Sequence, residues 1–431
     1  MNLWDRLQTA LPPGQARILV NLGHLARRKN TGLYLVGGAV RDLLMGRSMQ
    51  TPDLDLVVEG DAIALAHAAS MELRAALSMH KQFGTATLSF ENGASVDLAT
   101  ARTETYKNPG ALPRVQAADT ILQDLARRDF TINALAASVA SEQPGELVDP
   151  HGGADDLEQG LLRVLHPDSF MDDPTRIFRG IRFQHRFDFG FEYETNTLLH
   201  SALDAEILHR LSGARLRKEI TACFEDPARV SIINELNGLN IDSGALAPGL
   251  GLHTALLDPD DTVRAALDAL CAGDNPLAPQ EWVVYLMAAC HGAGDETLLN
   301  LARRIALSRK QAAPLLNPLF YSLDARAPLE DPETGPAEVE NLLAGAEDEV
   351  LVYLYAAAAE NQGRERVARF VHSTRAIKLE INGSDLLGMG HEPSPIFAKV
   401  LREVRRSKIQ GNVKNRRQEL ALARKLLNAW D

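Results

Sequence analysis

Apolar residues recur along this chain with two spacings, and the change of spacing divides it. Up to about residue 135, short runs that alternate between apolar and polar residues lie beside segments of helical spacing, which predicts a mixed sheet with helices. Beyond that point, Ala- and Leu-rich segments with helical spacing are separated by prolines, so we expect helices almost throughout. The pattern therefore predicts an α+β first part and an all-α remainder.

Several elements of the first part can be placed by range. The spacing predicts one short helix within residues 1–30, with Pro12, Pro13 and Gly14 ahead of it, and another helix over 61–76. Two alternating runs, 84–90 and 94–99, flank Asn92-Gly93, which is a strong hairpin signal.

The next two segments differ in pattern. Residues 104–123 contain Pro and Gly and show no periodicity, so we predict a loop, and long loops in compact domains are more often functional than accidental. Residues 124–137 return to helical spacing and predict a helix.

Charge adds an asymmetry that the pattern does not show. The 431 residues carry a net charge of −12, but residues 361–431 hold 15 Lys and Arg against 7 Asp and Glu, a balance of +8. Such a tail indicates a polyanionic partner, although solvated helix charges would look the same. The three cysteines lack metal-ligand spacing, and no window resembles a membrane span or a signal peptide, so we expect a soluble cytoplasmic protein.

The first chemical signal is a glycine pair. Gly37 and Gly38 follow an apolar run and precede a helix-compatible segment with Arg41. A glycine pair lets backbone amides approach an anion, and an arginine one turn later can bind the same phosphates. The pattern predicts a phosphate-binding turn.

The second signal is a pair of carboxylates. Asp53 and Asp55 stand two apart in DLDLVV, so both would lie on one face of a strand while the leucines point inward. Carboxylates placed in this way suit Mg²⁺, and two such ions can assist phosphoryl transfer. Asp97, in the second strand of the hairpin, is either a third ligand or a support for Arg102, and the sequence leaves this open.

Two further segments carry arginine. In RRDFTINA, consecutive helical residues do not share a face, so at most one of Arg127 and Arg128 is expected to point to the site, and Asn133 is expected beside Asp129.

The second segment, DDPTRIFRGIRF, has polar residues at three-residue spacing, which form one stripe on a helix and offer an acceptor and donors to a base: Asp173, Arg176, Arg179 and Arg182. Either Asp172 or Asp173 can instead cap that helix, and the sequence does not decide between them.

Together the ordered motifs LVGGAVRD, DLDLVV, VDLATAR, RRDFTINALA and DDPTRIFRGIRF resemble the class II tRNA nucleotidyltransferases, which include CCA-adding enzymes and bacterial poly(A) polymerases of the DNA polymerase β-like superfamily. The resemblance implies an elongated, sickle-shaped protein with an α+β nucleotidyltransferase head and a helical neck, body and tail. We expect the head over residues 1–138, the neck with the base-reading motif over 139–235, the body over 236–345 and the basic tail over 346–431.

The resemblance also assigns roles. It implies that Asp53 and Asp55 are the catalytic ligands for Mg²⁺ in a two-metal site. The nucleotide contacts that it implies are Gly37, Gly38, Arg41, Arg128, Asp173, Arg176, Arg179 and Arg182.

The implied function is template-independent addition of CCA to tRNA 3′ ends from CTP and ATP. Addition of CC only or A only, or poly(A) synthesis, stays open within the same family, and a non-catalytic RNA-binding protein is the alternative from another class. Asp172 stands where relatives often have Glu. No protein partner is indicated.

The tail resembles the C-terminal segment of longer members of the family and is expected to bind tRNA. The basic residues expected to contact RNA phosphates are Arg402, Arg405, Arg406, Lys408, Lys414, Arg416 and Arg417.

Overall fold

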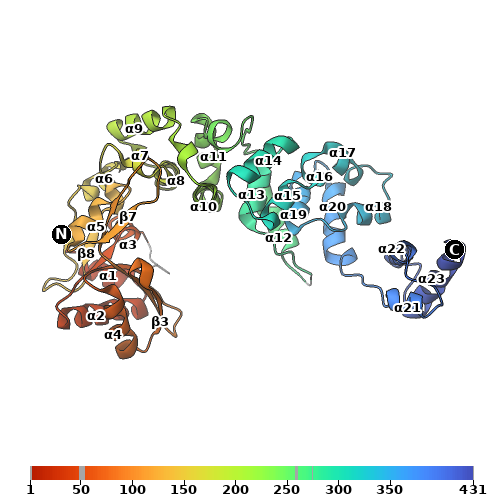
Figure 1. The fold of residues 1–431 in the computed structure, drawn as a ribbon, viewed down its shortest axis with the longest axis horizontal. Coiled ribbons are helices and arrows are strands. Elements are labelled where there is room, and N and C mark those ends of the chain that lie inside the picture. Colours follow the sequence, from red (N-terminus) through yellow and green to blue (C-terminus); the bar gives the residue numbers. More distant parts are fainter. Residues whose placement is uncertain (1, 48–53, 258–260, 274, 431) are drawn as a thin grey trace. The chain divides into compact units, whose positions relative to one another are not determined.

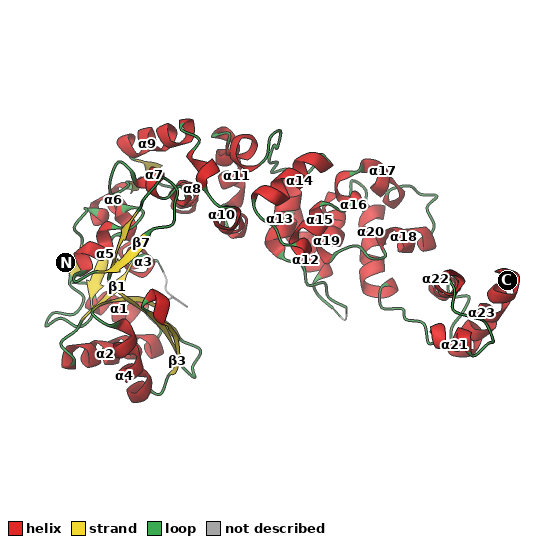
Figure 2. Ribbon diagram, in the orientation of Figure 1, coloured by secondary structure: helices red, strands yellow, loops and turns green. Residues whose placement is uncertain are grey.

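The computed structural model describes residues 2–47, 54–257, 261–273 and 275–430. The chain forms two compact units, Met1–Arg215 and Leu216–Asp431. Figure 1 follows the chain from one to the other, and Figure 2 shows that the strands belong to the first unit, while the described part of the second unit consists of helices and loops. The predicted order, a mixed sheet followed by helices, is confirmed.

The first unit is built on a seven-stranded sheet with the order β3-β4-β5-β2-β1-β8-β9. Only the β2–β5 pair in this sheet is parallel. The strands are β1 (Gly32–Val36), β2 (Leu54–Glu59), β3 (Ala76–His80), β4 (Thr85–Ser89), β5 (Ser95–Thr100), β8 (Ala136–Ser138) and β9 (Leu147–Val148).

Helices of the first unit pack on this sheet or follow it in the chain. They are α1 (Trp4–Ala10), α2 (Pro13–Arg28), α3 (Gly38–Leu44), α4 (Ala62–Leu73), α5 (Ile121–Ala126), α6 (Gly153–Gln159), α7 (Ser169–Asp172), α8 (Thr175–Phe187) and α9 (Tyr193–Asp204). The larger core joins α1, α2 and α4 to the inward residues of the strands, such as Leu35, Leu56 and Leu98. A smaller core on the other side joins Val36 and Val57 to Leu125 of α5. Apolar contacts therefore fix β1 and β2 from both sides.

Local patterns explain where several of these elements lie. Helix α4 begins after Asp61, whose Oδ1 accepts a hydrogen bond from the Ala64 amide at 3.0 Å. Strands β4 and β5 form the antiparallel hairpin predicted around Asn92-Gly93. The short helix expected behind Pro12 and Pro13 is α2 and is confirmed. Helix α1, which ends at Ala10, was not predicted. Proline lacks an amide hydrogen and is favoured at the first helical position, so Pro12-Pro13 separates two helices.

Two other predictions need correction. The loop expected over residues 104–123 contains a two-stranded antiparallel hairpin, β6 (Arg102–Thr105) with β7 (Arg114–Ala117), and the start of α5. Strand β6 (RTET) is polar on both faces, and the alternation in β7 (RVQA) covers only four residues, all exposed, so the pattern did not mark a strand pair. The helix expected over 124–137 stops at Ala126, and a 3₁₀ turn (Thr131–Asn133) and β8 follow. Long-range pairing ends it, because Phe130 forms an antiparallel bridge with Val164.

Short parallel strands β10 (Leu161–Leu162) and β11 (Gly190–Phe191) complete the first unit. Helix α10 (Gly213–Glu225) begins at its end. The later helices are α11 (Arg229–Gly238), α12 (Thr262–Leu270), α13 (Glu281–Ala289), α14 (Asp295–Arg304), α15 (Arg309–Leu315), α16 (Pro318–Tyr321), α17 (Leu323–Arg326), α18 (Pro336–Leu343), α19 (Asp348–Ala357), α20 (Asn361–Arg369), α21 (Gly383–Leu387), α22 (Pro395–Ile409) and α23 (Arg416–Trp430).

The second unit has its own cores. Helix α19 is central, since it packs against α12, α13 and α20. The last three helices share a separate small core that includes Leu386, Val400 and Leu427. Within the described ranges, no helix is long and apolar enough to cross a membrane.

Candidate active site

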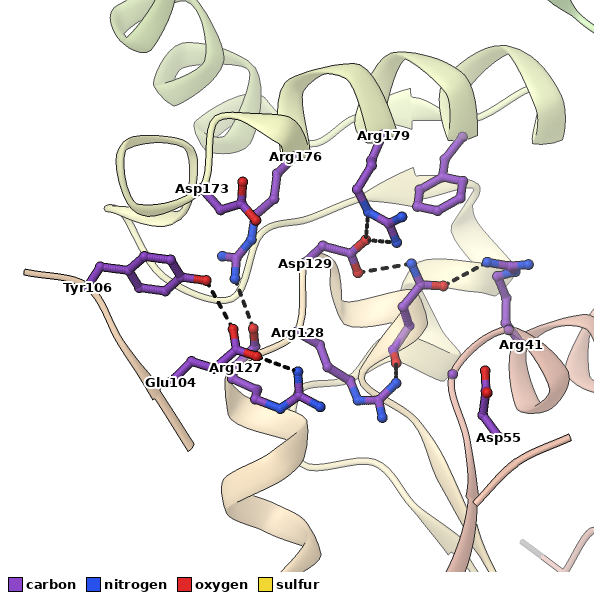
Figure 3. A pocket seen from close by; sticks show the side chains of 14 residues that line it. Arg41, Asp55, Glu104, Tyr106, Arg127, Arg128, Asp129, Asp173, Arg176 and Arg179 are labelled. Carbon is purple, nitrogen blue, oxygen red and sulfur yellow. Dashed lines mark hydrogen bonds and ion pairs between the residues drawn. The ribbon is translucent and has the colours of Figure 1, made fainter. Parts of the chain in front are cut away.

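One cleft in the first unit collects most of the side chains that the sequence singled out. Its volume is about 450 Å³. Its walls come from the β1–α3 turn, β2, the β6–β7 hairpin, the segment after α5, the link between α7 and α8, and α8 itself (Figure 3). The lining residues are Gly37, Gly38, Arg41, Asp55, Glu104, Tyr106, Arg127, Arg128, Asp129, Asn133, Asp173, Arg176, Arg179 and Phe183. This cleft is the candidate active site.

The glycine turn is tightly constrained. Gly37 has a φ of +66°, a conformation that glycine adopts without steric cost. A Cβ atom at Gly37 would lie 2.8 Å from Nη1 of Arg128, so the position also allows a close approach of that guanidinium. The glycine turn predicted from the sequence lies at this place, and the structure gives two reasons why residue 37 is glycine.

Arg41 lies on α3 and is only 8% exposed. Its Nη1 donates to Oδ1 of Asn133 at 2.7 Å, and its Nε donates to Oδ1 of Asp42 at 2.9 Å. The ring of Phe187 faces the guanidinium, with its centroid 4.5 Å away. Burial lowers the pKa of Arg41, and the Asp42 carboxylate opposes that shift. A buried guanidinium with this many neighbours is held in one position.

Asp55 lies on β2 at the edge of the cleft, on the same side as Arg41 in Figure 3. Its side chain is exposed, while Leu54 and Leu56 are buried at 1% exposure, as the predicted alternation requires. Asp97 of β5 stands directly beside Asp55 in the parallel register. The Thr87 hydroxyl donates to Oδ1 of Asp97 at 2.5 Å.

Asp53 lies outside the described residues. Among the residues that the structure does describe, no group of three His, Cys, Asp or Glu side chains is placed to hold a metal ion. The pair Asp55 and Asp97 nevertheless puts two carboxylates on neighbouring strands, which is a donor set that suits a hard cation.

The tandem arginines differ from the prediction. The helical spacing of the segment predicts at most one of Arg127 and Arg128 at the site, but both line the cleft. Helix α5 ends at Ala126, so the helical rule does not apply to them. Asp124 holds both, with Oδ1 accepting from Arg127 Nε at 2.9 Å and Oδ2 from Arg128 Nη2 at 3.1 Å. Burial lowers the pKa of Arg128, and Asp124 opposes this.

The predicted stripe on α8 is partly in the cleft. Arg176 is 4% exposed, and its guanidinium donates to the Ser169 hydroxyl at 2.5 Å and to the Arg127 carbonyl at 2.8 Å. Arg179 binds Asp129, with Nε 2.7 Å from Oδ2. Arg182, predicted with them, is described but does not line the cleft. Steps of three residues precess around a helix, so the last member of the stripe turns away.

Asp173, and not Asp172, caps helix α8. Oδ1 of Asp173 accepts from the Thr175 amide at 3.0 Å, which is the capping bond, and from Nη2 of Arg215 at 2.6 Å. Asp172 is the last residue of α7. Asp173 therefore caps the helix and lines the cleft at once.

Two polar lining residues were not singled out by the sequence. Glu104 on β6 accepts hydrogen bonds from Arg102, Arg127 and the Tyr106 hydroxyl, each at 3.0 Å. Burial and the Glu104 charge raise the pKa of Tyr106. Both residues lie in or beside the hairpin that was predicted as a loop, so the missing strand signal concealed them.

The basic residues of the tail divide into two groups. Three are in close ion pairs: Arg405 with Glu340 at 2.8 Å, Lys408 with Glu419 at 2.5 Å, and Arg416 with Asp385 at 2.5 Å. The other four are exposed, and the nearest carboxylate oxygen to Arg406 is that of Glu403 at 3.9 Å. These four are Arg402, Arg406, Lys414 and Arg417.

Comparison with known proteins agrees with this geometry. The family model described as the poly A polymerase head domain matches residues 33–163. The A-adding tRNA nucleotidyltransferase of Halalkalibacterium halodurans is 30% identical over 99% of this chain and 96% of its own length. The chain belongs to the tRNA nucleotidyltransferase family.

Other members of the family show the same extent of likeness. The A-adding tRNA nucleotidyltransferase of Geobacter sulfurreducens is 32% identical over 97% of this chain, which spans about half (48%) of that relative's length. A solved complex of a CCA-adding enzyme with ATP has a TM-score of 0.80 and 28% identity, and the match covers 100% of this chain and 99% of that one. The family expected from the motifs is confirmed, and so is its fold class.

Proposed function

We propose that this protein adds nucleotides to the 3′ end of tRNA without a nucleic-acid template. One observation carries the proposal: a single cleft combines the glycine turn with Arg41, the carboxylate of Asp55, and the Asp173–Arg176 pair. These groups suit, in turn, a triphosphate, a divalent cation and the edge of a base. We infer that the RNA substrate is tRNA because the similar proteins are named tRNA nucleotidyltransferases.

Two products are compatible with this cleft. The motifs predict complete CCA addition from CTP and ATP, and the likeness to a solved CCA-adding enzyme over its whole length supports this. Two relatives that match nearly all of this chain are A-adding enzymes, which favours transfer of the terminal A alone. We place A addition first and CCA addition second.

The experiment uses purified protein, Mg²⁺, and tRNA transcripts that end before the first C, after the second C and after the A, each with one labelled nucleotide. An A-adding enzyme extends only the transcript that ends in CC, and only with ATP. A CCA-adding enzyme also extends the shortest transcript with CTP. Extension of the complete tRNA with many A residues would indicate a poly(A) polymerase, and no incorporation into any transcript would contradict the proposal.

A divalent cation, which we propose to be Mg²⁺, would be held by Asp53 and Asp55, and the register of β2 and β5 supports Asp97 as a further oxygen ligand. When bound, such ions activate the attacking hydroxyl and stabilise the leaving pyrophosphate. The exposed pair Asp55 and Asp97 fits this role, since two neighbouring carboxylates repel each other unless a cation lies near them.

The remaining residues bind and orient the nucleotide. Gly37 and Gly38 leave the backbone accessible to the triphosphate, and Arg41 and Arg128 provide positive charge beside it. Asp173 offers its second carboxylate oxygen, and Arg176 its remaining N–H groups, to the base. Arg179 contributes to the same wall of the cleft, and Arg182 would act from outside the lining.

The four-part division into head, neck, body and tail is also part of the proposal. In it, the tail binds tRNA through phosphate contacts, which fix the RNA but do not read its sequence. A protein truncated before Gly383 lacks α21, α22 and α23, which share one small core. We expect it to bind tRNA more weakly than the full chain, and unchanged affinity would contradict the role of the tail.

A further inference from the structure

Helix α8 contacts Arg41 directly, although the two belong to different walls of the cleft. The guanidinium of Arg41 lies 4.5 Å from the ring centroid of Phe187 and 5.5 Å from that of Phe183. Both rings are on α8, the helix whose first turns carry Arg176 and Arg179. The base-facing side of the cleft therefore packs against the phosphate-facing arginine.

A polar route makes the same connection. Arg179 donates from Nε to Oδ2 of Asp129 at 2.7 Å, and Oδ1 of Asp129 accepts from Nδ2 of Asn133 at 3.0 Å. Oδ1 of Asn133 then accepts from Nη1 of Arg41 at 2.7 Å. In Figure 3, dashed lines join Arg179 to Asp129, and two more lead from Asp129 through an unlabelled side chain to Arg41. Asp129 and Asn133 are 9% and 7% exposed, so water competes little for their hydrogen bonds.

The amide of Asn133 satisfies both of its neighbours. Burial favours the neutral form of Asp129, but Arg179, Asn133 and the Phe130 amide outweigh it and lower its pKa to about 2, so it is an anion at neutral pH. The group facing that anion must donate, and the group facing the Arg41 guanidinium must accept. An asparagine side chain has one end of each kind, and the Asp129 contact determines which end Arg41 meets.

We infer that Asn133 is a positioning residue that sets Arg41 against the nucleotide phosphates and links it, through Asp129 and Arg179, to helix α8. This inference rests on the proposed function, because it takes the ligand of Arg41 to be a triphosphate. It adds a residue that acts through Arg41 and not on the substrate itself.

The test measures binding by calorimetry with two partial ligands, inorganic tripolyphosphate and adenosine, and measures KM and kcat for ATP. Loss of one hydrogen bond to a charged group weakens binding by about 10-fold or more. We therefore expect Asn133→Ala to reduce the affinity for tripolyphosphate, and to raise the KM for ATP, by that factor. Adenosine affinity should stay close to wild type, and the thermal unfolding midpoint shows whether the variant is folded. Asn196→Ala, an exposed asparagine of α9, is the matched control and should change nothing.

Asn133→Asp is the second variant and keeps the test decisive even where the alanine variant fails to fold. It keeps an acceptor for Arg41 but offers Asp129 no donor at neutral pH, so its tripolyphosphate affinity should fall by roughly three- to ten-fold. Tripolyphosphate binding within two-fold of wild type, in either folded variant, would overturn the inference. An equal loss of adenosine binding would also overturn it, since that indicates general distortion of the cleft.

The experiments distinguish a failure of this inference from a failure of the proposed function. A wild-type protein that incorporates no nucleotide into tRNA but binds tripolyphosphate contradicts the proposed function, and the variants still test how Arg41 is positioned. A wild-type protein that transfers nucleotides, with Asn133 variants that bind tripolyphosphate normally, contradicts only the inference.

Discussion

The arginines of the cleft and the basic residues of the tail are held in different ways. In the cleft, Arg41 and Arg176 are 8% and 4% exposed, and each guanidinium donates to oxygens on other elements. In the tail, Arg402 and Lys414 are exposed. Removing a charge from water is costly unless partners compensate, so the buried arginines occupy fixed positions and the exposed ones do not.

This difference separates two kinds of recognition. A fixed, desolvated guanidinium distinguishes ligands by geometry, because an unmatched partner leaves it without a hydrogen bond. An exposed cation attracts any phosphate and loses strength as salt rises. Substitutions in the cleft should therefore change rates and selectivity, and substitutions in the tail should change salt dependence.

The largest expected effect is that of Asp55→Ala. Because the carboxylate is exposed at the edge of the cleft and contributes little to the core, the protein should fold normally. Loss of a metal ligand should lower the rate of nucleotide incorporation into tRNA by about 10³-fold or more. Asp204→Ala, an exposed aspartate of α9, serves as the control. If Asp55→Ala incorporated nucleotides at the wild-type rate, Asp55 would not be a catalytic residue.

Arg176→Ala should have the next largest effect. The arginine is buried and joins Ser169 to the Arg127 carbonyl, so its loss removes the donor fork proposed to face the base. We expect kcat/KM for the correct nucleotide to fall by about 100-fold and discrimination against other nucleotides to weaken, because a site that must satisfy a base edge discriminates strongly. Single-nucleotide kinetics with all four nucleotides measures both.

Arg176→Lys and Arg17→Ala complete this comparison. Lysine keeps the charge but not the planar fork, so selectivity should stay low in the lysine variant. Arg17 is exposed on α2, and its removal should leave kinetics unchanged. If Arg176→Lys kept the nucleotide selectivity of the wild type, the positive charge alone would be sufficient for selection, and the contrast with the exposed cations of the tail would fail.

Gly37→Ala tests the close approach at the glycine turn. With φ +66° and ψ −128°, Gly37 lies in a sparsely populated region that costs a non-glycine residue about 1–3 kcal/mol, and the new Cβ would meet Nη1 of Arg128 at 2.8 Å. We expect KM for the nucleotide to rise by roughly 10-fold, as on removal of one hydrogen bond to a charged group. Gly46→Ala is the control, since Gly46 also has a positive φ (+68°) and no atom of the described residues would lie within 4 Å of its Cβ. This variant should keep its KM.

The sequence was sufficient where local chemistry determines the structure. The glycine turn, the alternation around Asp55 and the start of α4 depend on neighbours within a few residues, and all were predicted. Residues 124–137 were not, because the end of α5 depends on pairing between Phe130 and Val164, far apart in sequence.

The candidate site shows the same division. Asn133 was expected beside Asp129, four residues away, and the two are hydrogen-bonded at 3.0 Å. Glu104 and Tyr106 were missed because β6 has no apolar residue to mark it as a strand. Arg127, which binds Glu104, is also 23 residues away in the sequence. Periodicity reports burial on one element, and it does not report which charged groups meet across elements.

Acid titration should reveal the buried network of the cleft. The pKa of Asp129 is lowered from 3.8 to about 2: burial raises it, but Arg179 and the hydrogen bonds to the carboxylate outweigh burial. A carboxyl with a depressed pKa stabilises the fold above its unfolded pKa, and the contribution is lost as pH falls through the folded value. The contribution at neutral pH is about 2 kcal/mol.

Asp129→Asn removes this titration. The difference in free energy of unfolding between wild type and variant should therefore shrink by about 2 kcal/mol between pH 5 and pH 2. Denaturant unfolding at several pH values measures it. A difference that stays constant over this range would show that Asp129 is not the group whose ionisation holds Arg179.

The smallest effects are expected in the tail, where they should appear in the salt dependence. When the logarithm of tRNA affinity is plotted against the logarithm of salt concentration, each lost contact between a protein cation and an RNA phosphate should make the slope less steep by about 0.7 to 0.9. Lys414→Ala and Arg417→Ala remove exposed cations, so each should lower the slope by that amount if RNA phosphates are their partners.

Lys408→Ala should behave differently, although it removes the same charge. Its ammonium lies 2.5 Å from Glu419, whose side chain is 0% exposed and also accepts from the Glu380 and Ile381 amides at 2.8 and 3.1 Å. Removing the lysine leaves a buried carboxylate without its cation, so the thermal midpoint should fall while the salt slope changes little. Equal slopes for Lys408→Ala and Lys414→Ala would show that exposure does not separate RNA-binding cations from structural ones in this tail.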